Sequence, residues 1–147
     1  MSGTVNLHRV FKAPMNRVFR AFSDPDALAS WNPPYGFIAK VHSFDFREGG
    51  SYKMSFKNFT TNQEHSFGGT FTTIKENELL VYGDKFDDPN LPGQMTNTVT
   101  FREVMGGTEV KITQEGIPDA IPVEMCYLGW EDSLHKLKCL VEPEINQ

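Results

Sequence analysis

The sequence lacks the features that would place it on nucleic acid or in a membrane. Among its 147 residues no run of Lys or Arg stands out, and the formal net charge is -5. Because nucleic acid and anionic lipid surfaces attract basic patches, both are poor candidates as partners. No window holds the ~20 apolar residues of a membrane-spanning helix. The opening MSGTVNLHRVF has no basic segment followed by an apolar one, so we expect no signal peptide.

Cysteine is also scarce. Cys126 and Cys139 are the only two, and both fall in the last helical pattern of the chain. They lie too far apart along that helix to form a disulfide. Unpaired thiols are typical of reducing compartments, so the sequence predicts a cytoplasmic protein.

The motifs that mark common metal sites and active sites are missing too. The sequence has no H-E-x-x-H, no C-x-x-C and no pair of histidines at helical spacing, since its histidines occur singly at His8, His42, His65 and His135. No metal site is therefore expected. It also lacks G-x-S-x-G, and its Gly doublets are not part of a phosphate-binding loop. These patterns identify no catalytic residue and imply no cofactor.

Aromatic residues are what the sequence has in abundance. It contains 12 Phe, 4 Tyr and 2 Trp, within an ordinary balance of 39% hydrophobic and 22% charged residues. Aromatic side chains bury large apolar areas, which is enough for a sizeable core, or for a core and a lined pocket. The length fits a single domain over residues 1–147.

The first part of the chain predicts one strand and two short helices. The strand covers residues 4–12, and Pro14 suits the first position of the helix that follows. Asp24 and the proline after it form a second helix start, an N-cap carboxylate before a proline. This second helix ends near Trp31, because the segment NPPYG cannot continue it.

From about residue 37 to 114 the hydrophobic period changes to two. In SYKMSFK the apolar side chains of Tyr52, Met54 and Phe56 share one face, while Ser and Lys share the other. This alternation is typical of a half-buried antiparallel strand. Further segments of this kind predict a run of about six strands.

One long helix, roughly over residues 121–142, closes the chain. Its apolar residues recur every three or four positions and form one face: Val123, Tyr127, Trp130, Leu134, Leu137 and Val141. Strands segregated from helices indicate an α+β domain, with the sheet wrapped around the terminal helix. We expect Trp130 to be largely buried and to point toward the sheet. Gly129 would either let a strand approach closely or leave space beside Trp130.

The sequence resembles the START-like (SRPBCC) helix-grip superfamily. Five segments occur in the order found there: HRVFKAPMNRVFRAFSDPDALASW, FREGGSY, GGTFTTI, TVTFREVMGGTEVKITQEGIP and GWEDSLHKL. The similarity is greatest to the branch of homologues of the activator of a heat-shock chaperone's ATPase (AHSA-like), over about residues 6–141. It implies a curved antiparallel sheet of six to seven strands that grips the C-terminal helix and encloses a cavity. Members carry lipids, sterols, polyketides or hormones, some are cyclases and some bind chaperones, so no catalytic residue is carried over.

Strand alternation predicts which side chains would face such a cavity. The candidates on the sheet are Tyr52, Met54, Phe56, Phe67, Phe71, Val99 and Phe101, and those on the helix are Tyr127, Trp130 and Leu134. Trp31 and Phe37 belong to an aromatic, proline-rich segment that would form one rim of the mouth, and the loop over 86–93 would form another. The alternative is that these side chains only fill a core.

Three functions follow from these observations. The one we expect is a cytoplasmic protein that binds a small hydrophobic or aromatic molecule without catalysis. The second is a chaperone-associated module of a stress response, which would need an exposed patch for its partner. The third is an enzyme of the polyketide cyclase or hydrolase kind, using Tyr52, His65, Tyr127 or Glu124 for proton transfer. It would require at least two polar side chains to meet in the pocket, one with a strongly shifted pKa.

Overall fold

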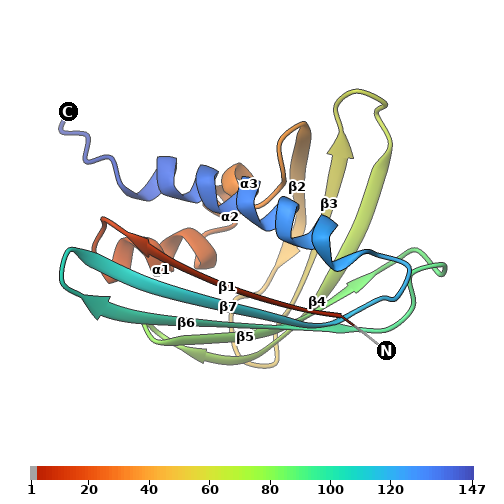
Figure 1. Ribbon diagram of the computed structural model, residues 1–147, viewed down its shortest axis with the longest axis horizontal. Helices are drawn as coiled ribbons and strands as arrows, with labels where there is room; N and C mark the ends of the chain where they lie inside the picture. Colours follow the sequence, from red (N-terminus) through yellow and green to blue (C-terminus); the bar gives the residue numbers. More distant parts are fainter. Residues whose placement is uncertain (1–2) are drawn as a thin grey trace.

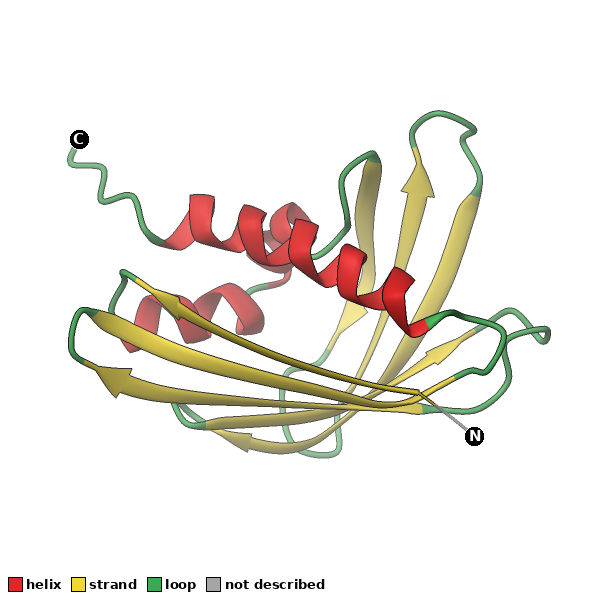
Figure 2. Ribbon diagram, viewed as in Figure 1, coloured by secondary structure: helices red, strands yellow, loops and turns green. Residues whose placement is uncertain are grey.

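The computed structural model describes residues 3–147 as one seven-stranded sheet with three helices (Figures 1 and 2). The elements follow one another as β1 (Gly3–Phe11), α1 (Met15–Ser23), α2 (Pro25–Trp31), β2 (Phe37–Phe44), β3 (Ser51–Asn58), β4 (Glu64–Lys75), β5 (Leu79–Phe86), β6 (Met95–Val104), β7 (Gly107–Ile117) and α3 (Val123–Val141). The strand order is β1-β7-β6-β5-β4-β3-β2, and all neighbours are antiparallel. The predicted α+β helix-grip architecture is confirmed.

The two short helices begin and end close to where the sequence predicts. The Asp24 carboxylate accepts hydrogen bonds from the backbone N–H groups of Asp26 at 2.9 Å and Ala27 at 3.3 Å, and α2 ends at Trp31. This side chain satisfies amides that have no partner within the first turn. Pro14 is the N-cap residue of α1 and not its first helical residue, a shift of one position.

The sheet is strongly curved, and its two ends lie in different positions relative to α3. In Figure 1, β1 and β7 run along one side of α3, while β2, β3 and β4 rise away from it on the other. The helix lies closest to β1, α2 and α1. Part of the concave face, on the central strands, is therefore not covered by a helix.

The core consists of two clusters of unequal size. The larger one joins the sheet to α1, α2 and the C-terminal half of α3, where Leu134, Leu137 and Val141 are buried. The smaller one lies toward the N-terminal half of α3, and its buried members among residues 3–147 are Val5, Met95 and Ile117. The predicted apolar face of α3 is real, but its N-terminal half is less covered than its C-terminal half. This difference in packing leaves space between α3 and the sheet.

Cys126 and Cys139 both lie on α3 and are free, as the sequence predicts. Across residues 3–147, none of the helices combines the length and the apolar character that crossing a bilayer requires.

Candidate ligand-binding cavity

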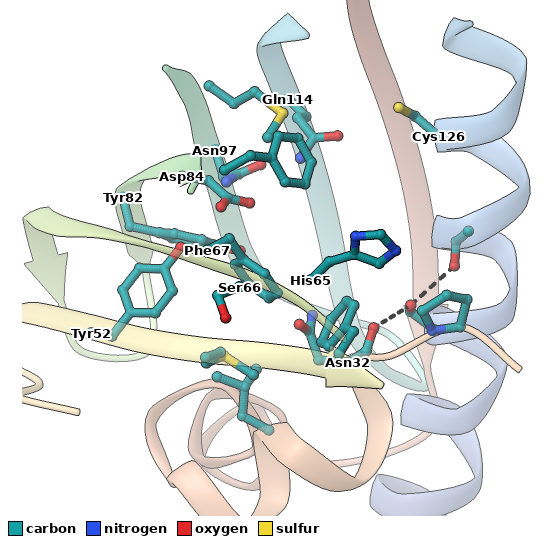
Figure 3. Close-up of a pocket in the computed structure, with 18 of the residues that line it drawn as sticks. Asn32, Tyr52, His65, Ser66, Phe67, Tyr82, Asp84, Asn97, Gln114 and Cys126 are labelled. Atoms are coloured by element: carbon teal, nitrogen blue, oxygen red, sulfur yellow. Dashed lines mark hydrogen bonds between the residues drawn. The ribbon is translucent and has the colours of Figure 1, made fainter. Parts of the chain in front are cut away.

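A cavity of about 900 Å³ lies between the sheet and the N-terminal half of α3 (Figure 3). Most of its lining is apolar, and aromatic rings from β3, β4 and β5 make up much of the wall. Seven of the side chains selected from the sequence line it: Phe37, Tyr52, Met54, Phe56, Phe67, Phe71 and Trp130. Sequence alternation thus located the cavity wall on β3 and β4. A role for these residues in ligand binding stays a prediction.

Five other selected residues are placed outside the lining. Three of them, Val99, Phe101 and Leu134, are at most 4% exposed and belong to the packed core. Tyr127 packs against the smaller core cluster, and its hydroxyl accepts a hydrogen bond from the backbone N–H of Asn6 at 3.1 Å. Alternation identifies the inner face of a strand, but core and cavity share that face, so it does not separate them.

Trp31 is the fifth, and it lies in the core instead of at a rim. Its side chain is 1% exposed and packs edge-on against Phe22, with the ring centroids 4.8 Å apart. Its indole N–H donates to the carbonyl oxygen of Ala21 at 2.8 Å. A ring with a satisfied N–H that bridges α1 and α2 is a packing residue.

The segment after Trp31 does reach the cavity, through Asn32, Pro34 and Phe37. The 86–93 loop contributes Asp87, Asp88 and Leu91.

Trp130 points toward the sheet, as predicted, although it is half-buried and not fully buried. Its indole N–H donates to Oε1 of Gln114 on β7 at 3.1 Å, which ties α3 to the sheet. Gly129 lines the cavity, and a Cβ atom built there would meet no atom within 4 Å. Gly129 therefore leaves space beside Trp130, and the alternative of a close strand approach is wrong.

The polar end of the cavity is formed by Asp84 and Asn97, two residues that sequence reasoning missed. Asn97 is 1% exposed, yet neither its Nδ2 nor its Oδ1 has a hydrogen-bond partner in the described protein. Oδ1 of Asp84 is likewise buried and unpartnered. Figure 3 shows both side chains at one end of the cavity, on adjacent strands β5 and β6. Buried polar atoms are usually paired with protein or with ordered water, so these two residues mark a place where water or a ligand supplies the missing hydrogen bonds.

A signal for these residues exists in the sequence. Register pairs Tyr82 with Asn97, and Asn97 with Gln114, so these side chains form one row across β5, β6 and β7. On each strand they point to the same side of the sheet as a buried apolar residue two positions away, which is Leu80 on β5, Val99 on β6 and Ile112 on β7. Polar side chains that recur on the apolar face of consecutive strands would have marked the site.

Burial controls the electrostatics of this polar end. It raises the pKa of Asp84 from 3.8 to about 7, and interaction with the Tyr52 hydroxyl opposes part of this rise. The pKa values of Tyr52 and Tyr82 are raised above their ordinary value, first by burial and then by the charge of Asp84. Both phenols thus stay neutral near pH 7, whereas Asp84 changes its charge there.

A close approach of backbones allows Tyr52 to reach this end. Tyr52 on β3 pairs with Gly69 on β4. The Tyr52 side chain extends past Gly69, and its hydroxyl donates to the carbonyl oxygen of Gly83 on β5 at 3.0 Å. A Cβ atom on Gly69 would lie 2.0 Å from that same oxygen. Only glycine fits between the two strands here without displacing the acceptor.

Substitution of Tyr52 by Phe tests this arrangement. We expect the free energy of unfolding to fall by about 1–2 kcal/mol, because a buried carbonyl loses its donor. The pKa of Asp84 should rise further, because the hydroxyl that opposes its rise is removed. Denaturant titration and carboxyl-carbon NMR measure the two effects. Tyr82→Phe is the matched control, since Tyr82 also lines the cavity but the donor to the Gly83 carbonyl is Tyr52. An equal loss in that variant would contradict the assignment.

Comparison with known proteins places the chain among relatives of the same fold. A crystal structure of a protein from Chromobacterium violaceum is 52% identical, with a TM-score of 0.95, and the match covers 96% of this chain and 98% of that one. A protein from Rhizobium leguminosarum is 25% identical, with a TM-score of 0.81, covering 98% and 97%. One from Rhodobacter sphaeroides, at 18% identity and a TM-score of 0.83 with 95% of each chain covered, shares the fold. A search of curated proteins finds no match.

The family comparison agrees with these structures. The family model described as "Activator of Hsp90 ATPase homolog 1-like protein" matches residues 12–142, which span the chain from the end of β1 to the end of α3. The resemblance noted in the sequence is thereby confirmed. This chain belongs to the family of Activator of Hsp90 ATPase homolog 1-like proteins.

Proposed function

We propose that the protein binds a small, largely apolar molecule in the cavity between the sheet and α3. The observation that carries this proposal is the combination of an apolar, aromatic wall with unpartnered polar atoms of Asp84 and Asn97 at one end. Small-molecule sites are mostly apolar, with a few polar groups that orient the guest. The volume, about 900 Å³, lies in the range of such sites.

Native mass spectrometry on protein purified from its own source tests the proposal. We expect a mass excess that corresponds to a small guest and disappears when the protein is denatured. Apolar and aromatic compounds should also raise the melting temperature, because a ligand that binds only the folded state stabilises it. Ligand binding would be contradicted if the purified protein carried no guest and no such compound raised its melting temperature.

Gly129 offers a direct way to fill the cavity without disturbing the sheet. We expect Gly129→Phe to place a ring in the open space and to weaken ligand binding at least tenfold. Its matched control, Gly129→Ala, should leave binding within about twofold and stabilise α3 by up to about 1 kcal/mol, because glycine is a poor helix former. Fluorescence titration with N-phenylnaphthylamine measures binding. Equal affinity of the two variants would show that the probe binds elsewhere.

One observation favours catalysis as a second candidate. Asp84, with a pKa of about 7, lies beside the Tyr52 hydroxyl inside the cavity, and a group that titrates near neutral pH is suited to general acid–base work. Of the four residues that the sequence suggested for proton transfer, only Tyr52 belongs to this pair. In residues 3–147, no cluster of three or more His, Cys, Asp or Glu could hold a metal ion. Chemical conversion of a co-purified guest, lost in Asp84→Asn while binding persists, would establish the enzyme.

A further inference from the structure

The charges around the cavity have one dominant sign. Its lining includes four acidic residues, Glu64, Asp84, Asp87 and Asp88, whereas none of the described lining residues is Lys or Arg, and His65 at the rim is the one histidine. Lys53 pairs with Asp87 and offsets one of these charges. An excess of one sign at the walls of a low-dielectric cleft attracts ligands of the opposite charge.

The unpartnered atoms specify the hydrogen bonds that a guest should make. Oδ1 of Asp84 and Oδ1 of Asn97 are acceptors, and Nδ2 of Asn97 is a donor. Two acceptors on neighbouring strands favour a guest with several donors at one point, and Nδ2 of Asn97 needs an acceptor, which a water molecule that enters with the guest can supply. An ammonium group has three, an alcohol has one, and a carboxylate has none and adds a negative charge. The rings of Tyr52 and Tyr82, whose centroids lie 6.0 Å apart, also line the cavity.

From these contacts we infer that the cavity selects amphipathic amines, with the apolar body against the aromatic wall and the protonated nitrogen between Asp84 and Asn97. This inference rests on the proposed ligand-binding function and names its chemical class. The Oδ1 atom of Asn97 supports it together with the acidic residues, because an unpartnered acceptor on a 1% exposed side chain marks the position of a missing donor.

The pH dependence of binding follows from the groups around Asp84. The titratable groups that line the cavity with it are Tyr52 from β3, Glu64 and His65 from β4, Tyr82 from β5, Asp87 and Asp88 from the following loop, and Cys126 from α3. Burial raises the pKa of Asp84 itself to about 7. Between pH 6 and pH 8 it gains the negative charge that an ammonium group needs. Affinity for an amine should therefore rise over this range, whereas affinity for a neutral alcohol should not.

Three probes with the same body and different head groups test the inference: phenylhexylamine, phenylhexanol and phenylhexanoate. Their dissociation constants are measured at pH 8 by displacement of N-phenylnaphthylamine from the full chain. We expect the amine to bind at least tenfold more tightly than the alcohol, and the carboxylate to bind most weakly. At pH 6 the difference between amine and alcohol should shrink at least threefold.

Two variants assign the selectivity to the polar end. Asp84→Asn should reduce the preference for the amine over the alcohol to below threefold. Glu115→Gln is the matched control, since it removes the same charge from an exposed position next to Gln114 on β7, outside the lining, and it should keep the preference. If the alcohol binds as tightly as the amine, this inference is overturned while ligand binding stands. If no probe binds and N-phenylnaphthylamine does not fluoresce, the proposed function fails as well.

Discussion

The Asp84→Asn variant is expected to gain stability relative to wild type as the pH rises. The free energy of unfolding of the variant minus that of wild type should be about 2–3 kcal/mol larger at pH 8 than at pH 5. Burial raises the pKa of Asp84 from 3.8 to about 7 in the folded protein, so the folded state holds this proton over a range where the unfolded state has lost it. One unit of pKa difference corresponds to about 1.4 kcal/mol, and most of the shift falls within this interval.

The sign follows from proton linkage. The folded state binds more protons than the unfolded state between about pH 4 and pH 7, so stability decreases as the pH rises through this range and then levels off. Asparagine cannot ionise, and the variant therefore lacks this contribution. Denaturant titrations of both proteins at several pH values give the difference, in which contributions common to both proteins cancel. Asp88→Asn, in the exposed loop after β5, is the matched control. If the difference between wild type and Asp84→Asn does not change with pH, the buried carboxyl is not the titrating group.

The Trp31→Ala substitution is expected to lower the free energy of unfolding by about 3–5 kcal/mol, the usual range for removing a large aromatic ring from a core. Trp31 is 1% exposed, and its indole N–H donates to the Ala21 carbonyl oxygen at 2.8 Å, so the variant loses packing and leaves a buried acceptor unpaired. Denaturant unfolding at constant pH measures the loss.

Phe37→Ala is the comparison that separates core from cavity wall. Phe37 was selected together with Trp31, but it is half-buried and lines the cavity. A ring that already borders open space has fewer atoms packed around it, and we expect its removal to cost about half as much as that of Trp31. Similar losses for both variants would mean that Trp31 lines the cavity or that Phe37 belongs to the core.

Several features of the fold could be predicted from local chemistry. Asp24 and Pro25 predicted the start of α2, and the alternation through Tyr52, Met54 and Phe56 predicted the inner face of β3. These predictions succeed because helix caps and strand parity depend on residues adjacent in sequence. The spacing on α3 likewise predicted that Trp130 points toward the sheet, and it does so through Gln114.

The polar end of the cavity could not be located in the same way, because it joins residues from separate strands. Asp84 and Asn97 become neighbours only through the pairing of β5 with β6, and the pKa of Asp84 is raised only because the folded chain excludes water from it. Whether an inner-face residue packs or borders a cavity also depends on what lies opposite. Val99, Phe101, Tyr52 and Phe67 all belong to the same buried cluster, but of these only Tyr52 and Phe67 also line the cavity.

The sequence by itself determined the fold class, the order of elements, the family and the apolar face of α3, since all of these depend on periodicity, capping and motif order along the chain. The tertiary structure alone decided that space remains beside Gly129, that Trp31 packs in the core, and that unpartnered polar atoms gather at one end of the cavity. The physical reason is that volume, desolvation and hydrogen-bond satisfaction depend on residues distant in sequence, which only the curvature of the sheet and the position of α3 bring together.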